Sequence, residues 1–287
     1  MIAHECLHPT RPARVVLLGA TGVIGRAVSA ILQREEIPLV SLSSKKLDLL
    51  SSDAADQLAK VLRPGDALLV LSCLPSSKDP ALGTMVSNVQ MAVNICAAIK
   101  RRHIAHVIYL SSDAVYPRHI RWIDENSSTE ACDPYSAMHL IREKMFSSLT
   151  EMPVAILRST QIYSTCDLHD AYGPNRFIRT ARAEGKIYLF GDGEELRDHI
   201  AVSDVAELIF RCLSHRSVGI LNIATGHSAS FAEIASLIAD AVSPKPEIVS
   251  VHRQIPITHR QFNTIACRVA FPDFVAIPLE RGLKAQV

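Results

Sequence analysis

The sequence lacks the cysteine spacings that typically hold disulfide frameworks or structural metals. Its seven cysteines include no CxxC pair, and an odd number of thiols cannot all pair within one chain. Reduced thiols are typical of the cytosol. The chain also has no uninterrupted run of about 18 apolar residues and no apolar stretch near its start that resembles a signal peptide. We therefore predict a cytoplasmic protein that neither spans a membrane nor holds a metal.

An excess of charge of one sign is also absent. The chain has 30 Lys and Arg residues against 29 Asp and Glu residues, which gives a formal net charge of +1. This balance offers no electrostatic attraction to nucleic acid or to an anionic membrane, so the predicted partners are small molecules. The 48% hydrophobic content over 287 residues supplies the core of one large α/β domain or of two smaller ones.

The only zinc-site pattern is HECLH, His4 to His8, which matches the HExxH motif of metalloproteases. That motif needs a stable helix in a cleft and a third ligand downstream. Here Pro9 follows at once, three residues precede the motif, and no further ligand spacing is evident. We expect a loose tail without a metal.

Apolar runs alternate with helical segments from Arg14 onwards. The run RVVLL, the segments IPLVSLS and DALLVLSCL, and later HVIYLSS and VAILRST read as strands, with helices between them, one of them at about Leu82 to Arg101. Continuously apolar strands are buried on both faces, as in a parallel sheet with helices on each side. We therefore predict an α/β fold with a doubly wound parallel sheet in residues 1–160.

The second half, residues 161–287, is predicted to form a smaller lobe interleaved with the first. A loop rich in turn formers is followed by the helical RFIRTARAEGK, then by a strand pair around a Gly-rich turn in IYLFGDGEELRDHIAV. A helix capped at Ser203 and the strand ILNIATG come next, and residues of about 200–224 are expected to return to the first domain. A last helix is predicted from Ser230 to Val242.

Three glycines in GATGVIG stand directly after a strand and at the start of a helix. Glycines allow a tight turn and close approach of the backbone to a pyrophosphate, while the helix offers free N–H groups and its positive dipole end. The spacing is GxxGxxG, which differs from the general GxGxxG fingerprint. We predict a dinucleotide site. The residues that we assign to its turn are Gly19, Thr21, Gly22, Val23, Ile24 and Gly25.

The region about 20 residues beyond the first glycine indicates which dinucleotide binds, because NAD-specific sites place an acid there to hold the ribose 2′-hydroxyl. This chain instead has SLSSKK, which offers hydroxyl groups and two lysines. Ser43, Ser44 and Lys45 can accept a 2′-phosphate. We predict NADP as the cofactor and keep NAD as the alternative, because the lysines can equally be solvated surface residues.

Six motifs follow one another in the chain: GATGVIG, LSSDAVYP, the DPYSAMHLIREK segment, GPNRF, GDGEELRDHIAVSDVAEL and LNIATG. In this order the sequence resembles the extended short-chain dehydrogenase/reductase family, and within it the NAD(P)-dependent sugar-nucleotide epimerase/dehydratase group. The likeness runs from about Arg14 to Leu283. It implies a Rossmann-type domain in residues 1–160, a lobe in residues 161–287 that binds a nucleotide sugar, and a homodimer.

The resemblance also assigns roles to single residues. Ser112 matches the hydroxyl residue that hydrogen-bonds the reacting oxygen, with Asp113 beside it in the substrate site. Tyr135 matches the proton-transferring tyrosine of the YxxxK motif. Dehydratases of the group carry a glutamate at the next position after this aspartate, where this chain has Ala114, so dehydration is the least favoured reaction.

Four further residues match binding positions of the family. Asp48 matches an aspartate that approaches the adenine, with Leu49 beside it. Asn175 and Arg197 fall where such enzymes bind the nucleotide diphosphate, and an arginine fork suits that anion. A helix cap for Asn175 and a surface ion pair for Arg197 are the alternatives.

His139 departs from the family pattern, because it stands where the family carries the YxxxK lysine. That lysine hydrogen-bonds the nicotinamide ribose, and its charge lowers the pKa of the tyrosine. His139 lies four residues after Tyr135, so the two share one helix face. A neutral imidazole can still donate one hydrogen bond to ribose but adds no charge. Lys144 faces away and Arg142 lies farther along, so neither is a clean replacement.

The missing charge favours one direction of reaction. Epimerases and dehydratases of the group first oxidise the sugar, which needs a base, whereas a ketoreductase needs a protonated tyrosine. We therefore predict a reductase that passes hydride from NADPH to a keto group of a nucleotide-linked sugar. An NAD-dependent epimerase is the first alternative, and a non-catalytic NAD(P)-binding regulatory protein is the second.

Overall fold

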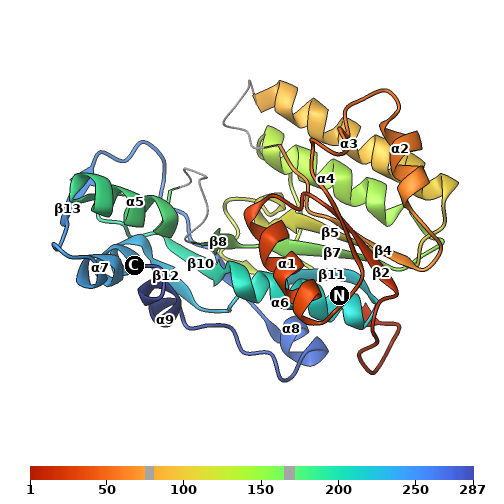
Figure 1. Ribbon diagram of the computed structural model, residues 1–287. Helices are drawn as coiled ribbons and strands as arrows, with labels where there is room; N and C mark the ends of the chain where they lie inside the picture. The colour runs from red at the N-terminus through yellow and green to blue at the C-terminus, as the bar shows by residue number, and fades with distance from the viewer. Residues whose placement is uncertain (75–80, 165–171) are drawn as a thin grey trace.

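A seven-stranded sheet forms the centre of the computed structural model, which describes residues 1–74, 81–164 and 172–287 (Figure 1). All neighbouring strands run parallel except the first pair. In spatial order the strands are β1 (Ala3–His4), β11 (Ser217–Ile223), β7 (Val154–Ser159), β5 (His106–Ser112), β4 (Asp66–Val70), β2 (Arg14–Leu18) and β3 (Leu39–Leu42).

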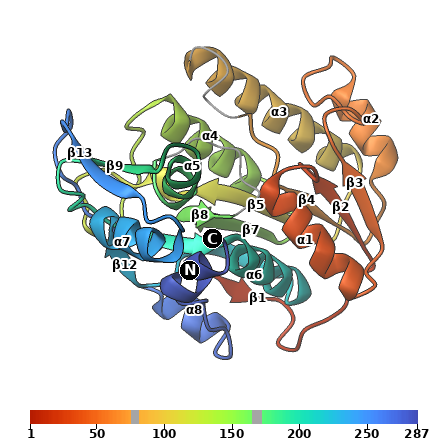
Figure 2. The same cartoon turned by 60° about the vertical axis from the view of Figure 1, so that its left-hand side comes forward.

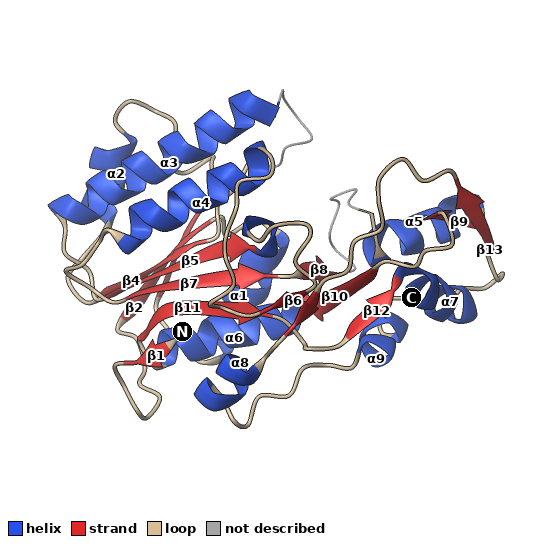
Figure 3. Ribbon diagram, turned by 180° about the vertical axis from the view of Figure 1, so that it is seen from behind, coloured by secondary structure: helices blue, strands red, loops and turns tan. Residues whose placement is uncertain are grey.

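Helices cover both faces of this sheet, as Figures 1 and 3 show. One face packs against α2 (Ala54–Val61), α3 (Ala81–Arg101) and α4 (Pro134–Ser147), and the other against α1 (Val23–Arg34), α6 (Val202–Ser214) and α8 (Ile265–Ala270). Two separate apolar cores result, one on each face. Because both faces are covered, β4 and β7 are buried along their whole length. The predicted doubly wound α/β fold is confirmed.

A smaller lobe lies beyond the carboxyl ends of the central strands (Figure 2). It has its own core, in which Phe177 and Phe231 are buried. Its strands are β8 (Gln161–Tyr163), β10 (Leu196–Ala201) and β12 (Ser228–Ser230) in one sheet, β9 (Lys186–Phe190) with β13 (Glu247–Val251), and β6 (Trp122–Ile123) with β14 (Gln261–Phe262). Its helices are α5 (Pro174–Glu184), α7 (Phe231–Ala241) and α9 (Leu279–Lys284), and a 3₁₀ turn, η2 (Asp113–Val115), follows β5.

The chain crosses between the two parts more than once. After β10 it returns through α6 to β11 in the large sheet, and then enters the lobe again. Residues 202–223 thus belong structurally with the first half. The division into a domain of residues 1–160 and a lobe of residues 161–287 stays a prediction.

The N-terminal segment differs from the expected loose tail. Residues Ala3 and His4 add an antiparallel strand to the edge of β11, and the His4 ring hydrogen-bonds the Ser217 hydroxyl (Nδ1 to Oγ, 2.8 Å) and the Ala270 carbonyl (Nε2 to O, 3.0 Å). The prediction was wrong because pairing of backbone groups with a sheet edge leaves no hydrophobic signature in so short a segment. No metal-binding cluster exists among the described residues.

Two local predictions in the second half were also wrong. β9 and β10 are strands on either side of a Gly-rich turn, yet they do not pair, since β9 pairs with β13 and β10 lies between β8 and β12. The helix expected to be capped at Ser203 begins at Val202 and has no side-chain cap. The helix predicted from Ser230 to Val242 is present as α7, Phe231–Ala241, and Ser230 is its N-cap in a capping box with Glu233.

Helix α3 is the most apolar long segment of the fold. Leu82–Arg101 has a mean hydropathy of 1.4, enough by length and composition to cross a membrane. Its buried face carries Ala92, Ile95 and Ile99, which pack into the core over the sheet. It is therefore the core helix of an α/β domain. The loop predicted before α5 includes residues 165–171, and with them Cys166, which lie outside the described residues.

Candidate active site

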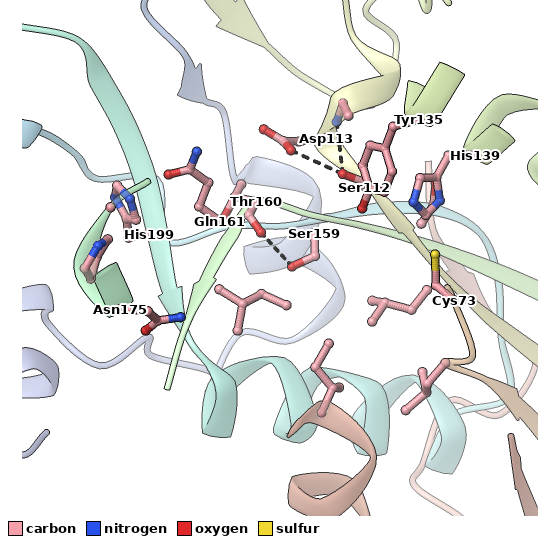
Figure 4. A pocket seen from close by; sticks show the side chains of 18 of the residues that line it. Cys73, Ser112, Asp113, Tyr135, His139, Ser159, Thr160, Gln161, Asn175 and His199 are labelled. Atoms are coloured by element: carbon pink, nitrogen blue, oxygen red, sulfur yellow. Dashed lines mark hydrogen bonds between the residues drawn. The ribbon is translucent and has the colours of Figure 1, made fainter. Parts of the chain in front are cut away.

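A cavity of about 520 Å³ lies where the carboxyl ends of β5 and β7 meet the smaller lobe (Figure 4). Ser112, Tyr135 and His139 line it on the side of the large sheet, and Gln161 and His199 on the side of the lobe. Because parallel strands end at this edge, residues far apart in sequence are brought together here. The three predicted catalytic residues therefore share one cavity.

A second cavity, of about 260 Å³, lies over the glycine turn. Its lining includes many residues predicted to contact the dinucleotide, namely Gly19, Thr21, Gly22, Ser43, Ser44, Asp48 and Leu49. Leu71 and Cys73, which follow β4, line both cavities. An elongated ligand can therefore run from the glycine turn to Tyr135.

Glycine is required at two positions of the turn for different reasons. Gly19 has φ of +90°, and a Cβ atom there would come within 2.8 Å of the Ser72 amide nitrogen. A Cβ atom on Gly25 would overlap the carbonyl oxygen of Gly19. Gly22 is the N-cap of α1 without a side-chain cap, so the helix N-terminus stays open toward the second cavity.

Some residues predicted at the dinucleotide site do not line either cavity. Lys45 is exposed, and neither it nor Val23 nor the buried Gly25 lines a cavity, while Ile24 lines the first cavity. The Asp48 carboxylate accepts a hydrogen bond from the backbone N–H of Leu50 (2.9 Å). Ser43 and Ser44 of the SLSSKK segment thus line the second cavity, and its two lysines do not.

Tyr135 occupies the first turn of α4 because of the sequence that starts this helix. Asp133 and Ser136 form a capping box, and Pro134 takes the first helical position. The side chain of Tyr135 is 39% exposed, while its hydroxyl points into the cavity toward Ser112 (Figure 4). Burial of this hydroxyl raises its pKa, and hydrogen bonding with Ser112 only partly opposes the rise. The phenol is protonated at neutral pH.

Ser112 is held by its own backbone neighbourhood. Its Oγ accepts a hydrogen bond from the Ala114 N–H (3.2 Å) and donates to the Asp113 carboxylate at 3.5 Å. Asp113 in turn forms an ion pair with Arg260 (3.0 Å), whose guanidinium also donates to the Tyr116 carbonyl (2.9 Å). This network fixes the end of β5 beside Tyr135.

His139 lies beneath Tyr135, with 4.6 Å between the ring centres, and only 3% of it is exposed. Its Nδ1 is 2.7 Å from the hydroxyl oxygen of Tyr109, and its Nε2 has no partner among the described residues. Burial, aided by the charge of Arg142, lowers the pKa of His139 to about 3. The imidazole is therefore neutral.

The contact with Tyr109 assigns the tautomer of His139. A buried phenol must donate its proton, and Nδ1 is the acceptor that the described residues offer to Tyr109. Nδ1 is then unprotonated, so the ring carries its proton on Nε2. His139 lines the cavity, and this unpartnered N–H is buried in the cavity wall.

At the lobe end of the cavity, three side chains have buried polar atoms without partners among the described residues: Thr160 Oγ1, Gln161 Oε1 and both ring nitrogens of His199. Burial lowers the pKa of His199 to about 3, so this ring is neutral as well. Asn175, on the first turn of α5, lines the same region, and its Oδ1 accepts from the Ser164 N–H (3.0 Å).

The predicted diphosphate ligand Arg197 is placed differently. It does not line the cavity, and its guanidinium donates to the carbonyl and the hydroxyl of Thr258 (2.6 and 2.8 Å). Sequence reasoning missed His199 in its place. Strand alternation relates the two positions, because residues two apart on a strand share a face, but it does not indicate which of the two reaches the cavity.

Comparison with known proteins decides the family. The model of the NAD dependent epimerase/dehydratase family matches residues 15–224. The chain belongs to this family. Enzymes of the family use NAD or NADP, and the sequence-based assignment to the epimerase/dehydratase group is confirmed.

Curated relatives of this family member are distant. GDP-L-colitose synthase of Yersinia pseudotuberculosis is 22% identical over 261 residues, which cover 82% of this chain and 84% of the relative. A putative UDP-glucose 4-epimerase of Methanocaldococcus jannaschii is 28% identical over 183 residues, 58% of this chain and 59% of the relative. These names span more than one reaction, so identity at this level does not choose between them.

Solved structures share the fold along nearly the whole chain. MoeE5 in complex with UDP-glucuronic acid and NAD superposes with a TM-score of 0.83 at 23% identity, covering 94% of this chain and 96% of MoeE5. A GDP-L-fucose synthetase of Naegleria fowleri bound to NADP gives 0.79 at 20% identity, with 98% and 94% coverage. The Rossmann-like architecture with a smaller C-terminal lobe is thus that of this family.

Proposed function

We propose that the protein is an NAD(P)-dependent reductase that acts on a keto group of a nucleotide-linked sugar. The observation that carries this proposal is the electrostatic state of the Tyr135–His139 pair. Burial keeps the phenol of Tyr135 protonated and holds the imidazole of His139 neutral. A protonated phenol is the acid that carbonyl reduction needs, and no cation stands at position 139 to favour the phenolate that oxidation needs.

The residues of the cavity fit a pyridine dinucleotide. The glycine turn leaves room for a pyrophosphate, the α1 N-terminus is uncapped, and the unpartnered Nε2–H of His139 can donate to a ribose hydroxyl. When bound, the cofactor supplies hydride to the carbonyl carbon. Ser112 would hold the carbonyl oxygen, and Tyr135 would give its phenolic proton to that oxygen. NADP is the predicted form, supported by Ser43 and Ser44 in the cavity wall and by the absence of an acid in SLSSKK.

A sugar fits the lobe end of the first cavity. Thr160, Gln161 and His199 are neutral, buried and short of hydrogen-bond partners, which suits hydroxyl groups better than anions. Relatives named for GDP-L-colitose and GDP-L-fucose synthesis, and MoeE5 with its bound UDP-glucuronic acid, support a nucleotide sugar as the substrate class. Asn175 remains our candidate for the diphosphate, whereas Arg197 would have to leave Thr258 to reach it.

The test is hydride transfer by the purified full chain. We expect NADPH to be consumed with at least one member of a panel of keto-sugar nucleotides, and Tyr135→Phe to lower the rate about 10²- to 10⁴-fold, the usual worth of a general acid. Absence of NADPH oxidation across the panel would reject the reductase.

An epimerase is the second candidate, favoured by relatives described as UDP-glucose epimerases. It would retain NAD through purification and interconvert sugars without net cofactor use. A non-catalytic NAD(P)-binding protein, the remaining alternative, would bind the dinucleotide without turnover, and Tyr135→Phe would leave its affinity unchanged.

A further inference from the structure

Arg142 is a buried cation behind the wall of the cavities. It lies on α4 less than one turn after His139 and has no exposed surface. One guanidinium nitrogen, Nη2, donates to the Ser72 carbonyl (2.9 Å), and the guanidinium carbon lies 4.9 Å from the ring centre of Tyr109. Nη1 contacts the sulfur of Met138 at 3.8 Å, the Cys73 thiol is a further hydrogen-bond partner of the side chain, and Nε has no partner among the described residues.

No counter-charge accompanies this guanidinium. Within the described part of the chain, no carboxylate lies within ion-pair distance of Arg142, and the adjacent Glu143 is already paired with Arg158 (2.7 Å) and accepts from Ser111. The two nearby thiols are neutral, because burial raises the pKa of Cys73 and, separately, raises the pKa of Cys96 to about 11. His139 is neutral too, as described above.

A buried charge without a partner costs stability, and replacing it by an apolar side chain would usually be neutral or stabilising. Side chains that lower stability in this way are expected mainly at functional sites. The position of Arg142 indicates which ligand it serves. Ser72, to which it donates, stands between Leu71 and Cys73, the two residues shared by both cavities. The charge therefore lies at the junction that an elongated ligand must pass.

The two redox forms of a pyridine dinucleotide differ by one positive charge, which the nicotinamide ring carries only when oxidised. We propose that Arg142 makes this site bind the reduced dinucleotide in preference to the oxidised one. The inference rests on the proposed function, in which the nicotinamide half lies in the first cavity near His139. This preference suits a reductase, because the oxidised dinucleotide formed by hydride transfer dissociates more readily than the reduced dinucleotide.

A merely structural role for Arg142 predicts a different result. Loss of its hydrogen bond to Ser72 or of its packing on Tyr109 would weaken both redox forms alike. Only loss of its charge changes the ratio of the two dissociation constants. The ratio is thus the quantity to measure, and it needs no substrate.

The experiment measures the affinity of NADP⁺ and NADPH for the full-length chain by calorimetry, and of NAD⁺ and NADH if that pair binds more tightly. In Arg142→Met we expect the ratio of the oxidised to the reduced dissociation constant to fall about tenfold, the effect of one unit charge at roughly 10 Å and an effective dielectric constant of about 20. Arg142→Lys should keep most of the ratio. Lys144→Met, an exposed position on the same helix, is the matched control for net charge and should leave the ratio unchanged.

The outcomes separate this inference from the proposed function. An unchanged ratio in Arg142→Met, with both forms still bound, would overturn the inference and leave the reductase standing. Wild-type protein that binds neither form would overturn both. Arg142→Gln, which keeps a donor for the Ser72 carbonyl, repeats the test with a second neutral side chain, and a retained ratio in that variant would equally reject the inference.

Discussion

At the scale of single residues, His139 replaces the lysine of the family, and two neighbours affect its protonation. The sequence alone did not connect either neighbour with it. Tyr109, thirty positions earlier on β5, donates to Nδ1 and directs the remaining proton of the ring to the cavity. Burial keeps the ring neutral, and the charge of Arg142 adds to this effect. His139 is therefore a neutral hydrogen-bond donor with its proton on Nε2, whereas a lysine at this position would be a cation.

Removal of the Tyr109 hydroxyl should allow the His139 ring to carry its proton on either nitrogen. In Tyr109→Phe we expect the affinity for dinucleotide to fall about threefold to tenfold, because one hydrogen bond is worth roughly 1 kcal/mol. Calorimetry would give the affinity, and ¹⁵N chemical shifts of the His139 ring would report the tautomer. Tyr116→Phe is the matched control, since Tyr116 also loses a buried hydroxyl bond, to Asn222 (2.7 Å), but lies outside both cavities. Equal losses of affinity in the two variants would contradict the assignment.

Restoring the family lysine should be costly in this chain. His139→Lys would place a second buried cation beside Arg142, and two like charges about 6 Å apart at an effective dielectric constant of about 20 repel by roughly 3 kcal/mol. We expect the free energy of unfolding in urea to fall by about that amount in His139→Lys and to recover in His139→Lys/Arg142→Met. Strictly additive effects of the two substitutions would show that the side chains do not interact.

At the scale of elements, the strand–turn–helix unit of β2 and α1 divides its glycines between folding and binding. Gly25 is buried against Gly19 in the turn, whereas Gly22 is exposed at the mouth of the second cavity. A pattern of glycines alone does not reveal this difference, because both positions satisfy the same spacing.

Alanine at the two positions should separate the roles. Gly25→Ala would overlap backbone and is expected to lose about 2 to 4 kcal/mol of stability together with dinucleotide binding. Gly22→Ala brings its Cβ only to 3.3 Å from the Gly19 carbonyl oxygen and should fold nearly normally while binding the dinucleotide more weakly. Thermal unfolding and calorimetry on the same samples would test this, and normal affinity in Gly22→Ala would remove the turn from the binding site.

Elements with strong local signals were predictable from the sequence. The apolar runs of β2, β4, β5 and β7, the helix of Tyr135 and the helix that follows Ser230 all carry their information within a few residues. What failed depends on distant partners. The pairing of β9 with β13 and the docking of Ala3 and His4 on β11 are set by backbone hydrogen bonds, which side-chain patterns do not encode.

The same contrast between local signals and distant partners applies to the candidate site. Ser112, Tyr135 and the glycines could be predicted because they sit in contiguous motifs. The role of Arg142 could not, because its burial and its lack of a counter-charge are properties of the packed helix, and nothing in LIREK distinguishes it from a solvated arginine.

At the scale of the whole molecule, three buried neutral histidines lower the stability of the fold in acid. Burial lowers the pKa of His106 to about 4 and those of His139 and His199 to about 3. These folded-state values lie below the value of about 6.5 in an unfolded chain, so the unfolded chain binds more protons. Stability that is present above pH 6.5 is lost as the pH falls toward 3.

We expect this loss to reach roughly 2 kcal/mol per buried histidine at pH 5 compared with pH 7. Urea unfolding at both pH values would measure it. His139→Gln should shrink the difference between the two pH values by about that amount, whereas His103→Gln, at a side chain that is 71% exposed, should leave it unchanged. A pH difference that is the same in all three proteins would show that His139 is protonated in the fold.

The short strand β1 fixes the direction in which the start of the chain extends from the sheet. It pairs with Ser217 and Val218 at the start of β11, which is the amino end of the parallel sheet, whereas both cavities open at the carboxyl ends of the strands. Because this pairing is antiparallel, the chain before Ala3 runs along β11 toward its carboxyl end, and Met1 lies beside Gly219. A tag or surface linker joined to Met1 would therefore extend toward the end of the sheet at which the cavities open. For flow-based measurement of the two dinucleotide forms, the protein is better attached at the amino ends of the parallel strands, for example at the exposed residues 63–65 before β4.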